Sequence, residues 1–352
     1  MEKTKPKILF TIPNFKTAGS QFVLLAIMRG IKETSRYKVF VAVENNYDCI
    51  PEAVSENDCI FLNYEGKTIK DTFYLLGLLK KYRIDILHSW DYKSSLVEAL
   101  ACRLSGTKYL YTKKNNSWSK RWVFKSILSS HIAYDNPEME ERFFKNWLLK
   151  SKTSFIPHGV DLNLFLPQNS RERNTFNICC IGNIVANKNQ GQIIEALVEL
   201  PKSIHLNLYG REDNDYRHYL NELVSKHRLE NRVHFWGYIK NSEIPQVLSN
   251  QDVFVLASRQ EGLPVSILEA LASGIPVLSS DSGGGARYIL HNGNGGYIFN
   301  SSEDLVAKIN NLYSDKILYE ELKLKAVENV RSRFSLQMEI NAYKDLYLKL
   351  IK

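Results

Sequence analysis

The stretch from Phe176 to Gly210, FNICCIGNIVANKNQGQIIEALVELPKSIHLNLYG, shows the repeating unit of the fold. It opens with a short apolar run at 176–183, continues through 189–200 with apolar residues at helical spacing, and ends in a second apolar run at 204–210. Short, nearly continuous apolar runs on either side of a helical pattern are typical of a parallel sheet with crossover helices. The sequence therefore predicts a β-α-β unit here.

The same alternation extends over both halves of the chain. Strands are predicted at 7–13, 37–44, 85–90, 233–239, 253–257 and 276–280, and helices at 21–33, 72–82, 94–104, 215–229 and 264–273. Such alternation places a parallel sheet between two helical layers and brings the loops that follow the strands to one edge of each sheet. We predict an α/β protein with two Rossmann-like doubly wound domains that face a central cleft.

The domain boundaries follow from length and composition. A chain of 352 residues is long enough for two domains. The polar run QNSRERNT at 168–175 separates the two patterns, so we predict an N-terminal domain at 1–167 and a C-terminal domain at 168–335. The segment 336–352 has apolar residues at helical spacing and is expected to form a helix that packs back on the N-terminal domain.

Composition excludes several classes of protein. Hydrophobic residues make up 44% of the chain and charged residues 24%, as in ordinary globular proteins. No apolar run reaches the roughly 20 residues that span a bilayer. The five cysteines are an odd number without C-x-x-C spacing, which favours neither disulfides nor a zinc cluster and suggests a cytoplasmic protein. We predict no metal site.

The net charge of +8 arises in the first half, because 1–167 holds 25 basic and 17 acidic residues and 168–352 holds 21 of each. A positive field attracts nucleic acids, anionic membranes and phosphorylated lipids alike, so the charge by itself leaves the partner open.

The segment 258–289, SRQEGLPVSILEALASGIPVLSSDSGGGARYI, carries the clearest signs of a binding site. Pro264 is typical of a first helical turn, so Gly262 and Leu263 present backbone N–H groups at a helix N-terminus, where anions bind. Glu261 lies just before this turn, and Glu269 is placed within the helix, where it could reach ligand hydroxyls.

This segment resembles the signature of the retaining GT-B glycosyltransferases of family 4, which has two glutamates eight residues apart. The resemblance extends to IPHGVD (156–161), CIGNIVANKNQGQIIEAL (180–197), RVHFWGYI (232–239) and GNGGYIF (293–299). It covers most of 155–300, in the family's order and spacing.

The resemblance implies roles for individual residues. Glu261 would contact the donor sugar, Glu269 the nucleotide ribose, and Lys188 the diphosphate. The amides of Gly262 and Leu263 would lie at the donor phosphates, as would Gly19, which stands at the family's glycine-rich turn after the first strand; Ala18 replaces the usual first glycine of that turn.

The chain departs from the family pattern at several positions. Asn183 stands where an arginine usually partners the diphosphate lysine, and Arg211 and Arg287 are possible substitutes. Arg287 itself occupies the place of an acidic residue. His158 replaces a common asparagine and is interpreted as structural.

Other candidate residues lie in the first half. His88 follows a predicted strand and could touch sugar or acceptor, and Asp91 could accept the acceptor proton. The segment from Lys108 to Lys125 mixes basic residues with aromatics, which would suit an anionic membrane surface, a lipid-linked acceptor, single-stranded nucleic acid or an amphipathic core helix. Its residues of these two kinds are Lys108, Lys113, Lys114, Lys120, Arg121, Lys125, Tyr109, Tyr111, Trp118, Trp122 and Phe124.

The resemblance implies a retaining hexosyltransferase that moves a sugar from a UDP- or GDP-linked donor to a glycan or lipid-linked acceptor, without a separate cofactor. Synthesis of capsule, lipopolysaccharide or another cell-surface polysaccharide is the expected setting, with the protein cytoplasmic or peripheral on the inner face of the membrane. Catalytic roles fall to Glu261, Lys188 and His88, and donor binding to Gly19, Asn183, Lys188, Gly262, Leu263 and Glu269. Two alternatives remain at this point: a nucleotide-sugar epimerase of the same fold, and an RNA-binding protein that uses Lys108 to Lys125.

Overall fold

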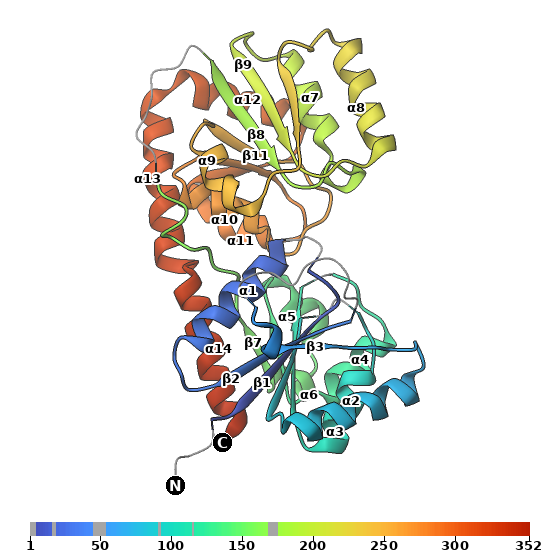
Figure 1. The fold of residues 1–352 in the computed structure, drawn as a ribbon. Coiled ribbons are helices and arrows are strands. Elements are labelled where there is room, and N and C mark those ends of the chain that lie inside the picture. Colours follow the sequence, from blue (N-terminus) through green and yellow to red (C-terminus); the bar gives the residue numbers. More distant parts are fainter. Residues whose placement is uncertain (1–4, 16–18, 45–53, 91–92, 115, 168–174) are drawn as a thin grey trace. The chain divides into compact units, whose positions relative to one another are not determined.

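A computed structural model describes residues 5–15, 19–44, 54–90, 93–114, 116–167 and 175–352. The chain forms two compact units, the first made of 1–158 and 336–352 and the second of 159–335 (Figure 1). The predicted boundary after Pro167 is therefore wrong by nine residues (167 − 158). The reason is packing: Val160 N–H donates to the Phe334 carbonyl at 2.9 Å, and Phe165 is buried in the core of the second unit.

The first unit contains a sheet of seven parallel strands in the order β3-β2-β1-β4-β5-β6-β7. The strands are β1 (Lys7–Ile12), β2 (Lys38–Val43), β3 (Cys59–Phe61), β4 (Ile86–Ser89), β5 (Lys108–Lys113), β6 (His131–Tyr134) and β7 (Thr153–Phe155). Nearly all side chains of the central strands are buried, on both faces of the sheet, because helices cover both sides.

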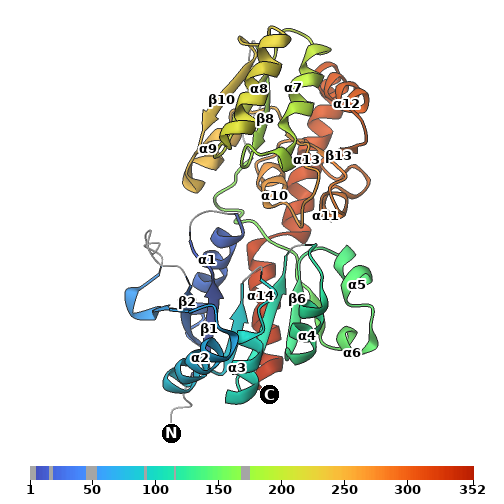
Figure 2. The same cartoon turned by 90° about the vertical axis from the view of Figure 1, so that its right-hand side faces the viewer.

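The helices of the first unit form two layers (Figure 2). On one side α1 packs against α14, and on the other α2 packs against α3 and α3 against α4. These helices, with two shorter ones and a 3₁₀ turn, are α1 (Gly19–Lys32), η1 (Glu56–Asp58), α2 (Thr68–Tyr82), α3 (Val97–Ser105), α4 (Lys120–Leu128), α5 (Glu138–Phe143), α6 (Trp147–Lys150) and α14 (Leu336–Ile351). The last segment of the chain thus forms a helix that belongs to the first unit.

The second unit contains a sheet of six parallel strands in the order β10-β9-β8-β11-β12-β13. They are β8 (Phe176–Ile181), β9 (Ile204–Tyr209), β10 (Val233–Gly237), β11 (Val253–Leu256), β12 (Val277–Ser280) and β13 (Gly296–Phe299). Strands β8 and β9 pair in parallel over their whole length. The first pair is Phe176 with Ile204, and the last is Ile181 with Tyr209.

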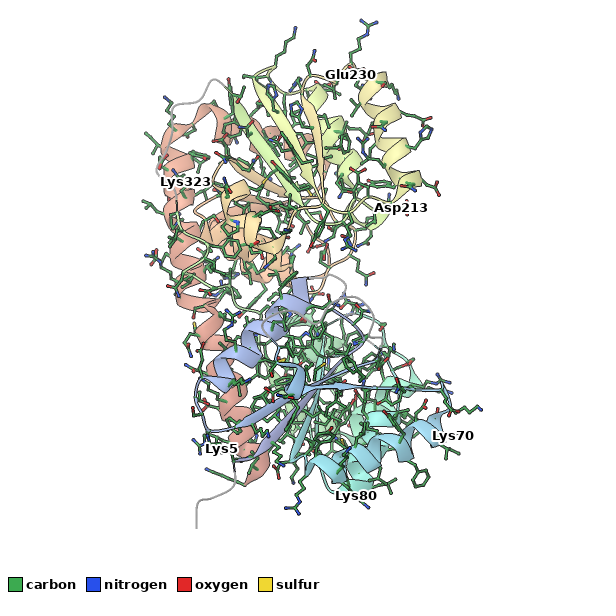
Figure 3. All side chains as sticks on the ribbon, in the orientation of Figure 1. Lys5, Lys70, Lys80, Asp213, Glu230 and Lys323 are labelled. Carbon is green, nitrogen blue, oxygen red and sulfur yellow. The ribbon has the colours of Figure 1, made fainter. Side chains whose placement is uncertain are left out.

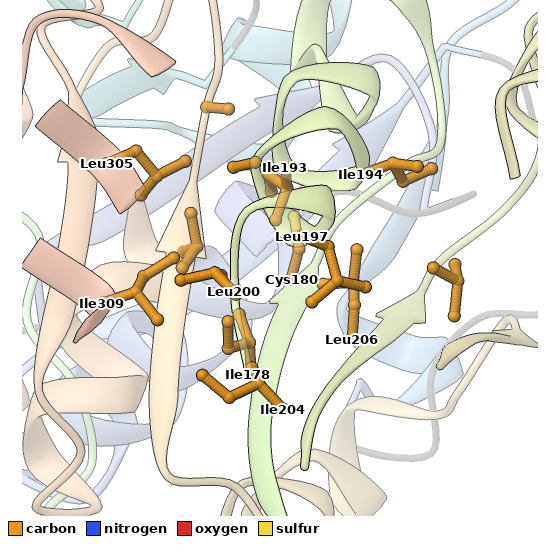
Figure 4. Packing of buried hydrophobic residues seen from close by; sticks show 14 of the residues in the cluster. Ile178, Cys180, Ile193, Ile194, Leu197, Leu200, Ile204, Leu206, Leu305 and Ile309 are labelled. Carbon is orange, nitrogen blue, oxygen red and sulfur yellow. The ribbon is translucent and has the colours of Figure 1, made fainter. Parts of the chain in front are cut away.

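Two hydrophobic cores lie on the two faces of this second sheet. The core in Figure 4 packs Ile178 and Leu206 against Ile193 of α7 and Leu305 of α12. The core on the other face packs Ile267 of α10 beneath the sheet. The helical segments are η2 (Ala186–Lys188), α7 (Gln190–Val198), α8 (Asn214–Lys226), η3 (Asn241–Glu243), α9 (Ile244–Leu248), α10 (Val265–Ala272), α11 (Gly285–Ile289), η4 (His291–Gly293), α12 (Ser302–Ser314) and α13 (Lys316–Arg333).

Each sheet has a point at which the strand order reverses direction. In the first unit it lies between β1 and β4, and in the second between β8 and β11, because these strands are neighbours although they are not consecutive. Doubly wound sheets bind ligands at such a point, beyond the carboxyl ends of the strands. The loops after β8 and β11 are therefore the first place to search for a site in the second unit.

Both units carry charged side chains on their surfaces. Charged side chains such as Lys70, Lys80 and Glu230 project outward (Figure 3) and are exposed. Among the described residues, no helix combines the length and the apolar character needed to cross a bilayer.

Candidate functional site

The loops after β8 and β9 start with glycines that allow close approach of the backbone. Gly182 and Gly210 have φ of 154° and 150°, and a Cβ atom on Gly210 would lie 2.0 Å from the Gly182 carbonyl oxygen. A side chain at Gly210 would therefore collide with backbone atoms. The two loops are therefore in close contact where the loop that carries Lys188 begins.

Lys188 and Glu261 form an ion pair across the point where the strand order reverses. Lys188 follows β8 and Glu261 follows β11, and Lys188 Nζ donates to Glu261 Oε1 at 2.6 Å. Both side chains are largely but not fully buried, at 20% and 15% exposure. A cation and a carboxylate, each partly open to solvent, thus stand side by side where a doubly wound sheet binds its ligand.

Backbone hydrogen bonds fix the loops on either side of this pair. Arg259 N–H donates to the Asn187 carbonyl at 2.8 Å, and Asn187 Nδ2 donates to the Gln260 carbonyl at 3.0 Å. Glu261 N–H donates to the Ser282 carbonyl at 2.7 Å. Asn187 and Ser282 therefore help to position the site, although no sequence signal singled them out.

The turn from Gly262 to Pro264 leads into α10. Pro264 is the N-cap residue in an extended conformation, so the helix begins at Val265 rather than at the proline. A Cβ atom on Gly285 would lie 1.9 Å from the Gly262 carbonyl oxygen, so the turn before α10 packs directly on the start of α11. The Leu263 side chain is buried, which leaves the backbone at Gly262 and Leu263 as the part of the turn able to meet an anion.

Glu269 is the fifth residue of α10 and is almost completely buried. Burial raises the pKa of its carboxyl to about 8. A carboxyl that is neutral near pH 7 can both donate and accept hydrogen bonds, which suits contact with paired hydroxyl groups.

Asn183, Arg211 and Arg287 belong to the same unit as this site and have different surroundings. Asn183 is exposed, and its carbonyl accepts a hydrogen bond from Gln190 Nε2 at 3.0 Å. Arg287 pairs with Asp281, and the Arg211 guanidinium lies 4.8 Å from the centre of the Tyr238 ring. Among the described residues, no three His, Cys, Asp or Glu side chains are grouped so that they could hold a metal ion.

His88 does not have the surroundings predicted for it. Its side chain is completely buried in the first unit, with Nδ1 2.7 Å from the Tyr347 hydroxyl and Nε2 2.8 Å from Thr112 Oγ1. Burial, together with the nearby Lys114, lowers its pKa well below the usual value. A buried ring with both nitrogens engaged cannot touch substrate in this conformation, so we correct the catalytic prediction to a structural role that joins β4 to α14. Gly19 begins α1, whereas Ala18 and Asp91 lie outside the described residues.

The interpretation of Lys108 to Lys125 as a membrane or RNA surface is also wrong in part. Tyr109, Tyr111 and Trp122 are core residues, and Lys113 and Lys125 are buried beneath them. Helix α3 packs against β5, and Thr112 of β5 lies 3.1 Å from the Tyr343 hydroxyl of α14, so neither face of the strand is free. Rings buried in this way can neither lie at lipid headgroups nor stack on bases.

The comparison with known structures gives the fold. A glycosyltransferase from Rickettsia africae superposes with a TM-score of 0.87 at 19% identity, over 99% of both chains. The two Rossmann-like units therefore have the GT-B fold.

Sequence comparisons give the family of the second unit. Residues 165–333 match the family model of glycosyl transferases group 1. A UDP-Gal:alpha-D-GlcNAc-diphosphoundecaprenol alpha-1,3-galactosyltransferase of Escherichia coli is 26% identical over 319 residues, covering 81% of this chain and 80% of that protein. An N,N'-diacetylbacillosaminyl-diphospho-undecaprenol alpha-1,3-N-acetylgalactosaminyltransferase of Campylobacter jejuni is 26% identical over 313 residues, 80% of each chain. Residues 165–333 are thus a glycosyl transferases group 1 domain, the comparisons support a glycosyltransferase, and the epimerase alternative has no support.

Proposed function

We propose that this protein transfers a hexose or N-acetylhexosamine from a UDP-linked donor, with retention of configuration, to a sugar on a lipid diphosphate. The observation that carries the proposal is the Lys188–Glu261 pair at the point of strand reversal. The two relatives described above support the acceptor class, since both act on diphosphoundecaprenol-linked sugars by name, and the first also uses a UDP-linked sugar.

The site residues divide the chemistry of transfer between them. As the bond between the anomeric carbon and the diphosphate oxygen breaks, negative charge grows on the leaving diphosphate. Lys188 and the backbone at the start of α10 are placed to stabilise that charge. Glu261 would hold the sugar and Glu269 the ribose. The acceptor oxygen then bonds to the anomeric carbon, and its proton passes to the leaving diphosphate. This route uses no metal and no cofactor.

Donor binding would rearrange the Lys188–Glu261 ion pair. A diphosphate near Lys188 offers a stronger anion than Glu261, which frees the carboxylate to accept hydrogen bonds from sugar hydroxyls. Lys188 would then contact the diphosphate and Glu261 the sugar, on the two sides of the bond that breaks.

The donor site can be tested by ligand-induced stabilisation. A ligand that binds only the folded state increases the free energy of unfolding, by about 2.7 kcal/mol at a ligand concentration of 100 times Kd, and so raises Tm. We expect UDP and its sugar conjugates to raise Tm more than GDP, ADP or CMP, and Lys188→Ala to abolish the shift. Lys202→Ala, at an exposed turn of the same unit, is the control and should retain it. An equal UDP shift in the wild type and Lys188→Ala would contradict the assignment.

Transfer itself is tested with the donor that shifts Tm and a short-chain lipid diphosphate sugar. We expect Glu261→Gln to lose turnover by roughly a hundredfold or more while UDP still raises its Tm, because the lost contact serves the sugar and not the diphosphate. The anomeric configuration of the product, read by proton NMR, must equal that of the donor, and inversion would refute retention.

We also propose that the protein acts at the membrane surface, where a lipid-linked acceptor resides, through an exposed face of α4 and α6. Phe124 and Trp147 are 58% and 78% exposed, and the two helices pack together. Lys120, Arg121 and Lys150 are exposed on the same helices. Exposed aromatic rings beside cations suit an anionic bilayer interface.

Vesicle partition tests the membrane surface. We expect Phe124→Ser with Trp147→Ser to weaken binding to phosphatidylglycerol vesicles by roughly tenfold or more, because burying one large apolar side chain contributes about 1.5–3 kcal/mol. Phe73→Ser on α2, where the ring is also exposed, is the matched control and should bind normally. Equal loss in the control would refute this face.

A further inference from the structure

The first unit contains a cavity that the donor site does not explain. It has a volume of about 390 Å³ and is lined by Lys93, Ser94, Ser117, Trp118, Ser119 and Trp122. These residues follow β4 and β5, so the cavity lies at the carboxyl edge of the sheet, next to the point where its strand order reverses. Its size is within the range of small-molecule sites.

Two indole rings form the apolar part of the lining. The Trp118 and Trp122 rings are nearly parallel, at 7°, with centroids 6.5 Å apart. Phe143 stacks on Trp118 at 4.7 Å, and Trp122 is only 4% exposed, so both rings are held in place. The negative face of an aromatic ring attracts the weakly positive C–H groups on one face of a sugar ring.

Cations lie directly behind one of these rings. Lys113 Nζ is 4.0 Å and Lys125 Nζ 5.0 Å from the centre of the Trp122 ring, and both lysine side chains are completely buried. Lys125 donates to the Lys93 carbonyl at 2.8 Å, and the Glu98 carboxylate is 4.0 Å from its amine. The Glu98 carboxylate offsets part of this charge, and Lys93 is the cation that lines the cavity itself.

The charge of Lys113 depends on pH near neutrality. Burial lowers its pKa to about 7; Lys125 lowers it further, whereas Asp135 opposes the change. Asp135 also faces His158, at 3.2 Å, so its charge is shared between two partners. An anion in the cavity would favour the charged form of Lys113.

Hydroxyl groups and a charged amine complete the lining. Ser119 precedes α4 but makes no capping hydrogen bond to it, so its hydroxyl is not committed to the helix. Lys93 reaches the surface, where it pairs with Glu44. A cation, hydroxyl groups and fixed aromatic rings around one cavity match a ligand that is both a sugar and an anion.

We propose that this cavity binds the acceptor by its sugar diphosphate end, with the sugar ring against Trp118 and the phosphate oxygens at Lys93 and Ser119. The inference rests on the proposed transfer to a lipid-linked sugar, and it adds the residues that recognise the acceptor. The shared chemistry is a sugar bonded to diphosphate, whether the diphosphate carries a lipid or is free.

The experiment measures binding without catalysis. The probe is N-acetylglucosaminyl diphosphofarnesol, and the readout is quenching of tryptophan fluorescence, with UDP-induced stabilisation measured on the same samples. Loss of one charge-assisted contact costs about 1.5–3 kcal/mol, so we expect Kd for the probe to rise roughly tenfold or more in Lys93→Met. Trp118→Ala should show a similar rise. Lys80→Met, an exposed lysine on α2, is the matched control and should leave Kd unchanged.

Each outcome decides the question. Unchanged probe affinity in Lys93→Met and Trp118→Ala would overturn the cavity as the acceptor site. So would a wild type that binds UDP but not the probe. Inorganic pyrophosphate that competes as well as the probe would overturn the sugar subsite, and N-acetylglucosamine 1-diphosphate that competes equally would show that the lipid is not needed. A wild type that binds the probe but neither binds UDP nor transfers sugar would instead refute the proposed function, which separates the two failures. Lys93→Met keeps the test valid if Trp118→Ala fails to fold.

Discussion

His158 is a buried cation whose removal should change both the size and the pH dependence of stability. Its Nε2 lies 3.2 Å from Asp135 and its Nδ1 3.0 Å from Glu339, which is on α14. Burial lowers the pKa of His158, but the two carboxylates outweigh burial and raise it from 6.5 to about 9. The imidazolium therefore holds the last helix of the chain to the first unit.

The magnitude follows from the difference between these two pKa values. At about 1.36 kcal/mol per pH unit, the rise from 6.5 to about 9 corresponds to roughly 3 kcal/mol. Between these pH values the folded state binds the proton and the unfolded state releases it. The contribution is thus complete below pH 6.5 and is lost as the pH rises through about 9.

His158→Gln removes the charge at every pH while it retains a polar side chain. We expect the variant to be about 3 kcal/mol less stable than the wild type at pH 6.5 and to approach it by pH 9.5. Urea unfolding followed by tryptophan fluorescence is the assay, since Trp90, Trp118, Trp122 and Trp147 report on the first unit. The exposed His218 on α8 gives the control, His218→Gln, with no expected change. A wild-type-minus-variant difference that stays constant from pH 6.5 to 9.5 would refute the reasoning.

Two further predictions concern the second unit. Burial holds the Glu269 pKa at about 8 against an ordinary 4.5, so the folded state loses stability as the pH rises between these values. Glu269→Gln should therefore be more stable than the wild type at pH 7, by up to about 3 kcal/mol, and should bind UDP more weakly. Thermal melts with and without UDP measure both effects. Gly285→Ala should abolish the UDP-induced rise in Tm, because its Cβ would lie 1.9 Å from the Gly262 carbonyl oxygen. The control is Gly77→Ala within α2, where no atom lies within 4 Å of the new Cβ, and urea unfolding should show a gain in stability of up to about 1 kcal/mol. Retained UDP binding in Gly285→Ala would contradict the role of this contact.

The periodic elements of the fold could be predicted because their patterns are local. The buried strands β1, β2 and β8 read as continuous apolar runs, and helices such as α7 have one apolar face. The short edge strands β3 and β7 have only three residues each and are partly exposed, so no apolar run marks them. The long helix α13 lacks a distinct apolar face and went unpredicted for the same reason.

The candidate site was predictable in its parts but not in its pairing. The resemblance pointed separately to Lys188 and Glu261, which are 73 residues apart, and nothing local in the sequence shows that their side chains touch. The strand order β8-β11 brings them together. His88 was misread for a related reason: its partners Thr112 and Tyr347 come from distant parts of the chain.

The segment Lys108 to Lys125 shows why composition alone misled the interpretation. Its lysines and aromatic rings suggested a surface that binds membranes or nucleic acid. Lys113 and Lys125 instead point inward, with their amines over the Trp122 ring. Long side chains can bury their stems and place a charge far from the backbone. Sequence shows which residues alternate with which, whereas the direction of a charge depends on the layer that covers the strand.

The two units repeat one strand order and differ in the charges that follow it. In the second unit, a lysine and a carboxylate stand at the strand reversal, as Lys188 and Glu261. In the first unit, the cavity after β4 and β5 has Lys93 in its lining and Lys113 and Lys125 behind it. Holding a diphosphate needs only cations, whereas guiding a sugar as its bond to diphosphate breaks also needs an acceptor of hydrogen bonds. On the functions proposed above, bond breaking belongs to the second unit and recognition of an anionic acceptor to the first.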